Sequence, residues 1–315
     1  MLMYLSAFAG FVLLFGGGEL LVRGAVMVSR RFGLSPLLIG MTVVAWCTSA
    51  PELVVSLGAA LEGRSDIAMG NVVGSNIFNI LGVLGAAAII TPILVDPRAL
   101  RRDMAVMLAA AAALALVATT GEITRLPASI LLIALMLYVY LSYRSEARRP
   151  SLPSATLHER ESAEIEVTGS MLSGIAYLFA GLVALVIGSR FLIVGASEIA
   201  RTFGVAEAVI GLSLVAVGTS LPELATSIIA ALRRHPDVAV GNVIGSNIFN
   251  ILGILGITAI VKPIGIAEQI ASIDIWVMIG ASLLLVPVLL WRGRIGRPVA
   301  GLFLLGYVGY LVVLF

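Results

Sequence analysis

Two acidic side chains, Glu52 and Glu223, stand inside stretches of the chain that are otherwise apolar. Each belongs to a copy of a short motif, TSAPEL at 48–53 and TSLPEL at 219–224. A carboxylate at the middle of a membrane costs roughly 3 kcal/mol on insertion scales, so an acid in such a place marks a functional site by default. The two glutamates are therefore the first candidates for chemistry.

A second motif repeats at the same spacing. GNVVGSNIFNILGVLG at 70–85 and GNVIGSNIFNILGILG at 241–256 differ at only two positions, both Val/Ile exchanges. In both motif pairs the copies are 171 residues apart. We interpret this as a duplicated membrane protein whose two halves jointly build one ion site.

Each copy of the first motif offers several oxygen ligands. Thr48 and Glu52 are four residues apart and share one face of a helix, and Ser49 flanks them. The second copy repeats this set with Thr219, Ser220 and Glu223. Carboxylate, hydroxyl and carbonyl oxygens are hard ligands, which suit Ca²⁺ and Na⁺ and do not suit Zn²⁺ or Cu²⁺.

The proline of each motif is expected to add backbone oxygens. A proline inside a helix leaves the carbonyl four residues earlier without its hydrogen bond. Pro51 should therefore free a carbonyl near Cys47, and Pro222 one near Gly218. In lipid such carbonyls need a neighbouring helix, water or an ion as a partner.

The second motif adds further oxygen ligands. Ser75 and Asn79 are four residues apart, and so are their counterparts Ser246 and Asn250. The surrounding glycines permit close helix packing, so we expect Asn79, Asn250 and the two glutamates to converge. The neighbouring Asn76 and Asn247 point about 100° away from the serine face. We expect these two amides to bond to the broken backbone of a neighbouring helix.

The composition excludes several classes of protein. The chain is 60% hydrophobic and only 12% charged, about half the charged fraction of a soluble domain, so most of it must face lipid or other apolar helices. A net charge of +2 gives no reason to expect nucleic acid. A single cysteine excludes an internal disulfide and a cysteine metal cluster. No cofactor and no obligatory protein partner are expected.

Stretches long enough to cross a bilayer, about 20 mostly apolar residues, number ten. The repeat offset maps the first five onto the last five, and an odd number per half makes the second half enter from the opposite side. We therefore predict an all-α inverted repeat, a fold typical of secondary transporters, with halves 1–144 and 171–315 joined by a cytoplasmic linker at 145–170. The predicted spans are 3–28, 35–60, 67–90, 103–119, 126–143, 171–195, 206–231, 238–260, 275–291 and 298–315.

Basic residues predict the orientation. When the loops are assigned alternately to two sides, fourteen of the 20 Lys and Arg residues fall on one side and four on the other. The richer side should be cytoplasmic, which places both termini outside the cytoplasm in a multi-pass protein of the inner cell membrane. Within the first span we expect Glu19 to pair with Arg23, and we expect no bridge between Glu19 and Arg190, its repeat counterpart. We expect Asp66 and Asp237 to be helix N-caps.

The paired motifs, in this order, resemble the alpha-repeats of the cation/calcium antiporter superfamily, specifically the prokaryotic sodium/calcium exchangers. The resemblance extends over nearly the whole chain. It implies an antiporter in which Na⁺ entry drives Ca²⁺ export by alternating access at one shared midplane site. It also implies that Ca²⁺ is held by Glu52 and Glu223, assisted by backbone oxygens of Thr48 and Thr219, with Asn79 and Asn250 lining the centre. Flanking Na⁺ positions would use Ser49, Ser220, Ser75, Ser246 and the carbonyls of Ala45 and Ala216.

Two positions depart from the family pattern. Cys47 is the counterpart of Gly218, where the family usually has glycine, and we expect a slightly more crowded cavity there. Asn250 stands where some relatives carry an aspartate. The site then has two acids, which leaves the ion stoichiometry and K⁺ cotransport open.

Alternatives to Na⁺-coupled exchange remain at this point. Proton-coupled Ca²⁺ exchange could use the two buried acids, because burial favours their protonated form, whereas the Ser- and Thr-rich surroundings favour Na⁺ ligands. A cation channel is disfavoured because no ring of pore-lining residues is evident. An intramembrane enzyme is disfavoured because no His, Cys–His pair or Ser–Lys pair lies at membrane depth.

Overall fold

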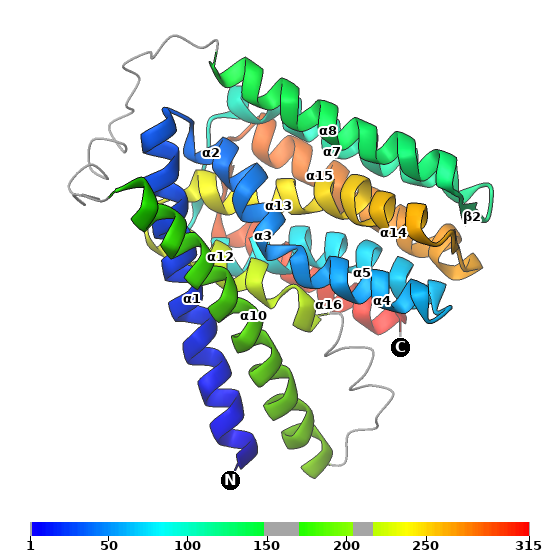
Figure 1. Ribbon diagram of the computed structural model, residues 1–315, viewed down its shortest axis with the longest axis horizontal. Helices are drawn as coiled ribbons and strands as arrows, with labels where there is room; N and C mark the ends of the chain where they lie inside the picture. Colours follow the sequence, from blue (N-terminus) through cyan, green and yellow to red (C-terminus); the bar gives the residue numbers. More distant parts are fainter. Residues whose placement is uncertain (1, 148–169, 204–216, 315) are drawn as a thin grey trace.

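The structure, a computed structural model, describes residues 2–147, 170–203 and 217–314. Within these ranges the chain is helical apart from short loops and four two-residue strands (Figure 1). The first half contains α1 Leu2–Phe32, α2 Pro36–Ile39, the π-helix η1 Gly40–Val44, α3 Ala45–Thr48, α4 Ala50–Leu61, α5 Ser65–Ile77, the π-helix η2 Phe78–Val83, α6 Leu84–Ile90, β1 Ile93–Leu94, α7 Pro97–Ala118, β2 Glu122–Ile123 and α8 Arg125–Ala147. The second half contains α10 Met171–Thr202, α12 Leu221–Leu232, α13 Pro236–Ile248, the π-helix η3 Phe249–Ile254, α14 Leu255–Val261, β3 Ile264–Gly265, the π-helix η4 Ile270–Asp274, α15 Ile275–Leu290, β4 Arg294–Ile295 and α16 Arg297–Leu314.

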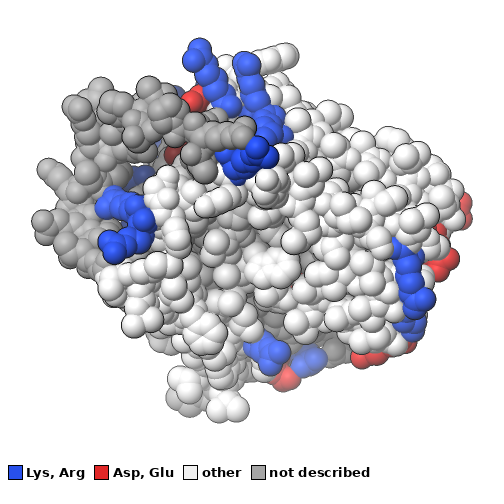
Figure 2. All heavy atoms as spheres, turned by 45° about the horizontal axis from the view of Figure 1, so that its top comes forward, with Lys and Arg blue, Asp and Glu red and all other residues white. Residues whose placement is uncertain are grey.

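Six described helices are long and apolar enough to cross a membrane. A seventh candidate consists of Pro36–Thr48 and Ala50–Leu61, which meet at a bend of 43°. Two further apolar helices, Leu221–Leu232 and Arg297–Val313, are shorter. Where the chain is described, the predicted spans fall on helical segments, apart from single residues at some span ends and the breaks at Ser49 and Ser220. Part of the seventh span, 206–231, lies outside the described residues, as does most of the linker at 145–170. Figure 2 shows a broad face almost free of charged side chains, as a lipid-facing surface requires.

The two halves are held together by contacts that occur in matching pairs. β1 pairs with β4 across the halves, and β2 pairs with β3, both antiparallel. Arg125 Nε donates to the carbonyl of Ile260 at 3.1 Å, and Arg297 Nε donates to the carbonyl of Ile89 at the same distance. Since each strand and each arginine has a repeat counterpart that makes the equivalent contact, the two halves exchange the same set of interactions.

Helices α1 and α10 lie side by side and project together from the rest of the molecule (Figure 1). Glycines recur every seven residues along both helices, at 10, 17 and 24 in α1 and at 174, 181, 188 and 195 in α10. A Cβ at Gly17 would lie 2.9 Å from the backbone nitrogen of Leu185, and one at Gly181 would lie 2.6 Å from that of Leu21. The two backbones are therefore in contact along this seam, in the small-residue manner of membrane helices.

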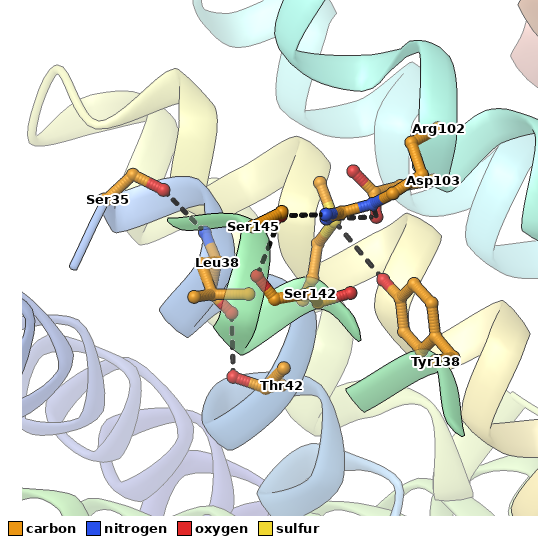
Figure 3. Close-up of polar contacts among 9 residues, drawn as sticks. Ser35, Leu38, Thr42, Arg102, Asp103, Tyr138, Ser142 and Ser145 are labelled. Carbon is orange, nitrogen blue, oxygen red and sulfur yellow. Dashed lines mark hydrogen bonds and ion pairs between the residues drawn. The ribbon is translucent and has the colours of Figure 1, made fainter. Parts of the chain in front are cut away.

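A polar cluster joins α7 to α8 near one end of the bundle (Figure 3). Arg102 Nη2 lies 2.8 Å from Oδ1 of the buried Asp103, and its Nη1 donates to Ser145 of α8. The Tyr138 hydroxyl of α8 donates to Sδ of Met41 in η1 at 3.5 Å. The repeat counterpart of Asp103, Asp274, accepts from the hydroxyl of Tyr310 at 3.0 Å.

Two local expectations have different outcomes. The pairing of Glu19 with Arg23 is confirmed, at 2.5 Å. The assignment of Asp66 and Asp237 as N-caps is wrong, because Arg64 and His235 occupy the N-cap positions of α5 and α13, and each aspartate is the second residue of its helix. A carboxylate in the first turn still interacts favourably with the positive end of the helix dipole.

The glycine seam makes a testable prediction. Gly17→Ala should lower the free energy of unfolding by about 1–3 kcal/mol, because the added methyl would overlap the α10 backbone. Gly16→Ala is the matched control, since its Cβ would meet no atom within 4 Å and alanine is the better helix former. Thermal unfolding in detergent, followed by tryptophan fluorescence, compares the two variants. Equal melting temperatures would contradict the close contact.

Candidate ion-binding site

Both TS-x-PEL motifs break a helix. α3 ends at Thr48, Ser49 has φ −82° and ψ 3°, and α4 begins at Ala50 with Pro51 in its first turn. Ser220 has nearly the same conformation before α12, whose first turn contains Pro222. The expectation that these prolines lie inside continuous helices is therefore wrong. Proline is tolerated in a first turn because the nitrogens there have no helical partner.

The freed carbonyl of the second copy already has a partner. The carbonyl of Gly218 accepts a hydrogen bond from the hydroxyl of Ser189, on α10, at 2.6 Å. In the first copy the half-buried Cys47 packs against the apolar cluster that contains Leu14 and Leu21 of α1. These contacts do not test whether Cys47 crowds the cavity, which stays a prediction.

Each helix break brings a serine of one half to the glutamate of the other. Ser220 Oγ donates to Glu52 Oε1 at 2.9 Å, and Ser49 Oγ donates to Glu223 Oε1 at 3.1 Å. Both glutamates are 0% exposed, and neither forms an ion pair with a described residue. The two acids are therefore held across the interface of the halves by hydroxyl groups, without any basic side chain.

Asn71 and Asn242 each link the backbone of one glutamate to the motif threonine of the opposite half. The Thr219 hydroxyl donates to Asn71 Oδ1 at 3.1 Å, while Asn71 Nδ2 donates to the carbonyl of Glu52 at 3.2 Å. The equivalent bonds run from Thr48 to Asn242 Oδ1 at 3.0 Å and from Asn242 Nδ2 to the carbonyl of Glu223 at 3.4 Å. The sequence analysis did not predict these bridges, although Asn71 and Asn242 are the second residues of the repeated motifs at 70–85 and 241–256.

The central asparagines lie in π-helical turns. Asn79 in η2 donates to Asn247 Oδ1 at 3.1 Å, and Asn250 in η3 donates to Asn76 Oδ1 at 3.3 Å. Asn247 Nδ2 donates further to the carbonyl of Asn76 at 3.3 Å. The expectation that both side chains bond to a neighbour's backbone is wrong for Asn76, whose Nδ2 contacts Sδ of Met278, whereas Asn247 does bond to a backbone carbonyl of the opposite half. The side-chain oxygens of both accept from amides of the opposite half. Widened turns of this kind are frequent at functional sites.

Four buried oxygens of this cluster have no hydrogen-bond partner in the described part of the chain. They are Glu52 Oε2, Glu223 Oε2, Asn79 Oδ1 and Asn250 Oδ1, two matching pairs from the two halves. Leaving a buried acceptor unpaired costs about 1–3 kcal/mol. As carboxylate and amide oxygens all four atoms are acceptors, and the amide nitrogen of each asparagine donates to the opposite half, so the cluster is chemically suited to a cation.

The other candidate ligands lie around this cluster. Ser75 Oγ is 3.1 Å from Ser220 Oγ, and Ser246 Oγ is 3.5 Å from Thr48 Oγ1. The carbonyl of Ala45 accepts from the amide of Ser49 at 2.9 Å and from the Thr48 hydroxyl at 3.3 Å. Ala216 lies outside the described residues.

Comparison with known proteins gives one consistent result. The profile of a family described as sodium/calcium exchanger protein matches residues 2–144 and 173–315. The inner membrane protein YrbG of Escherichia coli K12 is 35% identical over 97% of this chain and 94% of YrbG. The sodium/calcium exchanger MaX1 of Methanosarcina acetivorans is 31% identical over 99% and 98%, respectively.

A solved structure agrees with these sequence matches. The sodium-calcium exchanger NCX_Mj, soaked with 2.5 mM Na⁺ and 0.1 mM Ca²⁺, superimposes with a TM-score of 0.83 at 32% identity, over 99% of this chain and 98% of that one. The profile, the relatives and the structure all cover both repeated motif pairs. With its apolar helices and its buried acidic cluster, this chain is a multi-pass membrane protein that belongs to the sodium/calcium exchanger family.

Proposed function

We propose that the protein exchanges Na⁺ for Ca²⁺ across the membrane at the cluster formed by Glu52 and Glu223. The observation that carries the proposal is the set of four unpartnered buried oxygens, two of them carboxylate oxygens. Two buried negative charges without a basic partner are costly, and one divalent cation or two or more monovalent cations would neutralise them. The relatives named sodium/calcium exchangers support this choice of ions.

The ligands divide between the two ions by charge. Ca²⁺ takes six to eight oxygen ligands, mostly carboxylate and carbonyl, so it would lie between the two acids. We assign to it Glu52 and Glu223, backbone oxygens of Thr48 and Thr219, and the centre-lining Asn79 and Asn250. Flanking Na⁺ positions would use Ser49, Ser220, Ser75, Ser246 and the carbonyls of Ala45 and Ala216. When Na⁺ occupies the flanking positions, the carboxylates are shared with it, and Ca²⁺ loses ligands.

We further infer that the chain crosses the inner cell membrane ten times, as inverted halves 1–144 and 171–315 with a cytoplasmic linker at 145–170. The strand pairs support this arrangement, because β1 and β4 both fall in loops assigned to the cytoplasm and β2 and β3 in loops assigned to the outside. Both termini would lie outside the cytoplasm. In such proteins the site between the repeats is exposed alternately to each side.

A proton-coupled exchanger is the second candidate. The same two carboxylate oxygens that could bind a cation could each take a proton instead. The hydroxyls of Ser49 and Ser220 bonded to the other oxygens favour Na⁺, because they add neutral oxygen ligands that a proton does not need. A channel would differ from both in showing flux of Ca²⁺ without a counter-ion.

The acids provide the first test of function. Glu52→Gln and Glu223→Gln should each reduce Na⁺-driven ⁴⁵Ca²⁺ uptake into proteoliposomes to background, because each removes one of the two charges that offset the divalent ion. Glu122→Gln, an exposed acid in β2, is the control and should transport normally. Near-normal uptake by either site variant would exclude that glutamate from the Ca²⁺ site.

The coupling ion provides the second test. If each cycle moves more Na⁺ charge than Ca²⁺ charge, the rate of exchange should depend on the membrane potential, since moving one elementary charge across 100 mV is worth about 2.3 kcal/mol. Uptake is measured in vesicles with a Na⁺ gradient, a pH gradient or neither, each at two potentials clamped with valinomycin. We expect uptake only with the Na⁺ gradient, and at a rate that changes with potential. Uptake driven by the pH gradient alone would favour the proton-coupled alternative.

A further inference from the structure

Glu19, near the middle of α1, contacts two arginines. Its Oε1 is 2.5 Å from Nε of Arg23, on the same helix, and its Oε2 is 2.7 Å from Nε of Arg233. Arg233 is the C-cap residue of α12, the helix that carries Glu223. The second contact therefore ties α1 to the end of a helix that builds the ion site.

The internal repeat gives this pair a counterpart with the charges exchanged. An offset of 171 residues places Arg190 opposite Glu19 and Glu62 opposite Arg233. The alignment has no gap here, because the glycines of the α1 seam fall on glycines of α10 in the same frame. The structural positions also correspond, since Glu62 is the C-cap residue of α4 as Arg233 is of α12.

The counterpart pair is not formed in this structure. Glu62 is 65% exposed and lies 3.4 Å from Arg64, its neighbour in the same loop. Arg190 is exposed and makes no ion pair with any residue that the structure describes. Nearby, Lys262 Nζ donates to the carbonyl of Leu61.

Packing shows the same asymmetry. α1 packs along α12, where a Cβ at Gly18 would lie 3.3 Å from the carbonyl oxygen of Ala225. No comparable packing joins α10 to α4 among the described elements. The structure is thus one of two related arrangements: α1 lies against α12 here, and an exchange of roles between the halves would place α10 against α4.

We propose that Glu19–Arg233 and Arg190–Glu62 are reciprocal latches, each of which forms in one access state and opens in the other. The inference rests on the proposed function, because it uses the exchange of conformations between repeats that alternating access requires. With the predicted orientation, Glu19–Arg233 holds the cytoplasmic side closed and Arg190–Glu62 holds the outer side closed. A partly exposed ion pair shifts such an equilibrium by about two- to fivefold, which is enough to bias the states without locking either.

Arg23 is a matched control within the same cluster. It binds the same carboxylate as Arg233, but it lies on α1 and moves with Glu19. Removing Arg23 changes the charge around Glu19 to the same extent without breaking a contact between α1 and α12. Only the loss of Arg233 should change the balance between the two states.

The test measures how readily positions 62 and 190, which form no ion pair in this structure, come close enough to be cross-linked. In a Cys47→Ala background, Arg190→Cys and Glu62→Cys are joined by a short bifunctional methanethiosulfonate reagent in proteoliposomes, and the cross-linked yield is read on gels. Adding Arg233→Gln should raise the initial cross-linking rate about two- to fivefold. Arg23→Gln should leave it unchanged, and Arg233→Lys should return it toward the parent value.

Two outcomes would overturn the latches: no cross-link between positions 62 and 190 under any ion condition, or equal rates with Arg233→Gln and Arg23→Gln. Transport is measured separately on protein with all four latch residues intact. Reciprocal cross-linking without Na⁺/Ca²⁺ exchange would remove the proposed function and keep the latches. Normal exchange without reciprocal cross-linking would keep the proposed function and remove the latches.

Discussion

The structure depends on keeping two carboxylates in an apolar interior, where no basic side chain of the described ranges pairs with them. Glu52 and Glu223 are fully buried, and each has one oxygen bonded to a serine of the opposite half, while the other oxygen has no hydrogen-bond partner among the residues that the structure describes. An acid placed on a continuous apolar helix would find no such donor. The helix breaks at Ser49 and Ser220 bring these two hydroxyls to the glutamates of the opposite half. The hydrogen bonds from Asn71 and Asn242 to the carbonyls of Glu52 and Glu223 hold the first turns of α4 and α12 in place.

The asparagines solve the complementary problem of presenting neutral oxygen. An amide carries two donors as well as its acceptor, and a donor pointing at a cation would repel it. Here the amide nitrogens of Asn79 and Asn250 are bonded to the oxygens of Asn247 and Asn76, while their own Oδ1 atoms accept no hydrogen bond from a described residue. The π-turns that contain Asn79 and Asn250 widen the helix locally, which changes the direction of these side chains relative to a regular helix.

The helical segments and the two buried glutamates could be predicted from the sequence, because apolar length and duplicated motifs are visible in it. The binding of an ion by Glu52, Glu223, Asn79 and Asn250 stays a prediction. The hydrogen bonds could not be predicted. The sequence argument placed Pro51 inside a helix, while the structure starts a new helix there. A serine followed three residues later by a glutamate, with a proline between them, is a pattern typical of a helix start, and that pattern could have predicted the break at Ser49. The sequence argument also assigned Asn76 to a neighbour's backbone from the direction of its side chain on the regular helix α5, and a direction alone does not say which atoms of the opposite half the amide meets. The bridges from Asn71 and Asn242 depend on which half lies opposite, and no local pattern reports that.

The cross-half contacts have a consequence for biosynthesis. The glycine face of α1 packs on α10, and β1 pairs with β4, which follows it in the chain by about 200 residues. During translation α1 is inserted long before its partner exists, and its backbone seam must meanwhile face lipid or the insertion machinery. The first half therefore has no complete fold of its own, and assembly of the ion site must wait until nearly the whole chain has entered the membrane. A ribosome that stops early leaves an intermediate with two exposed seams, the kind of species that membrane quality control can recognise.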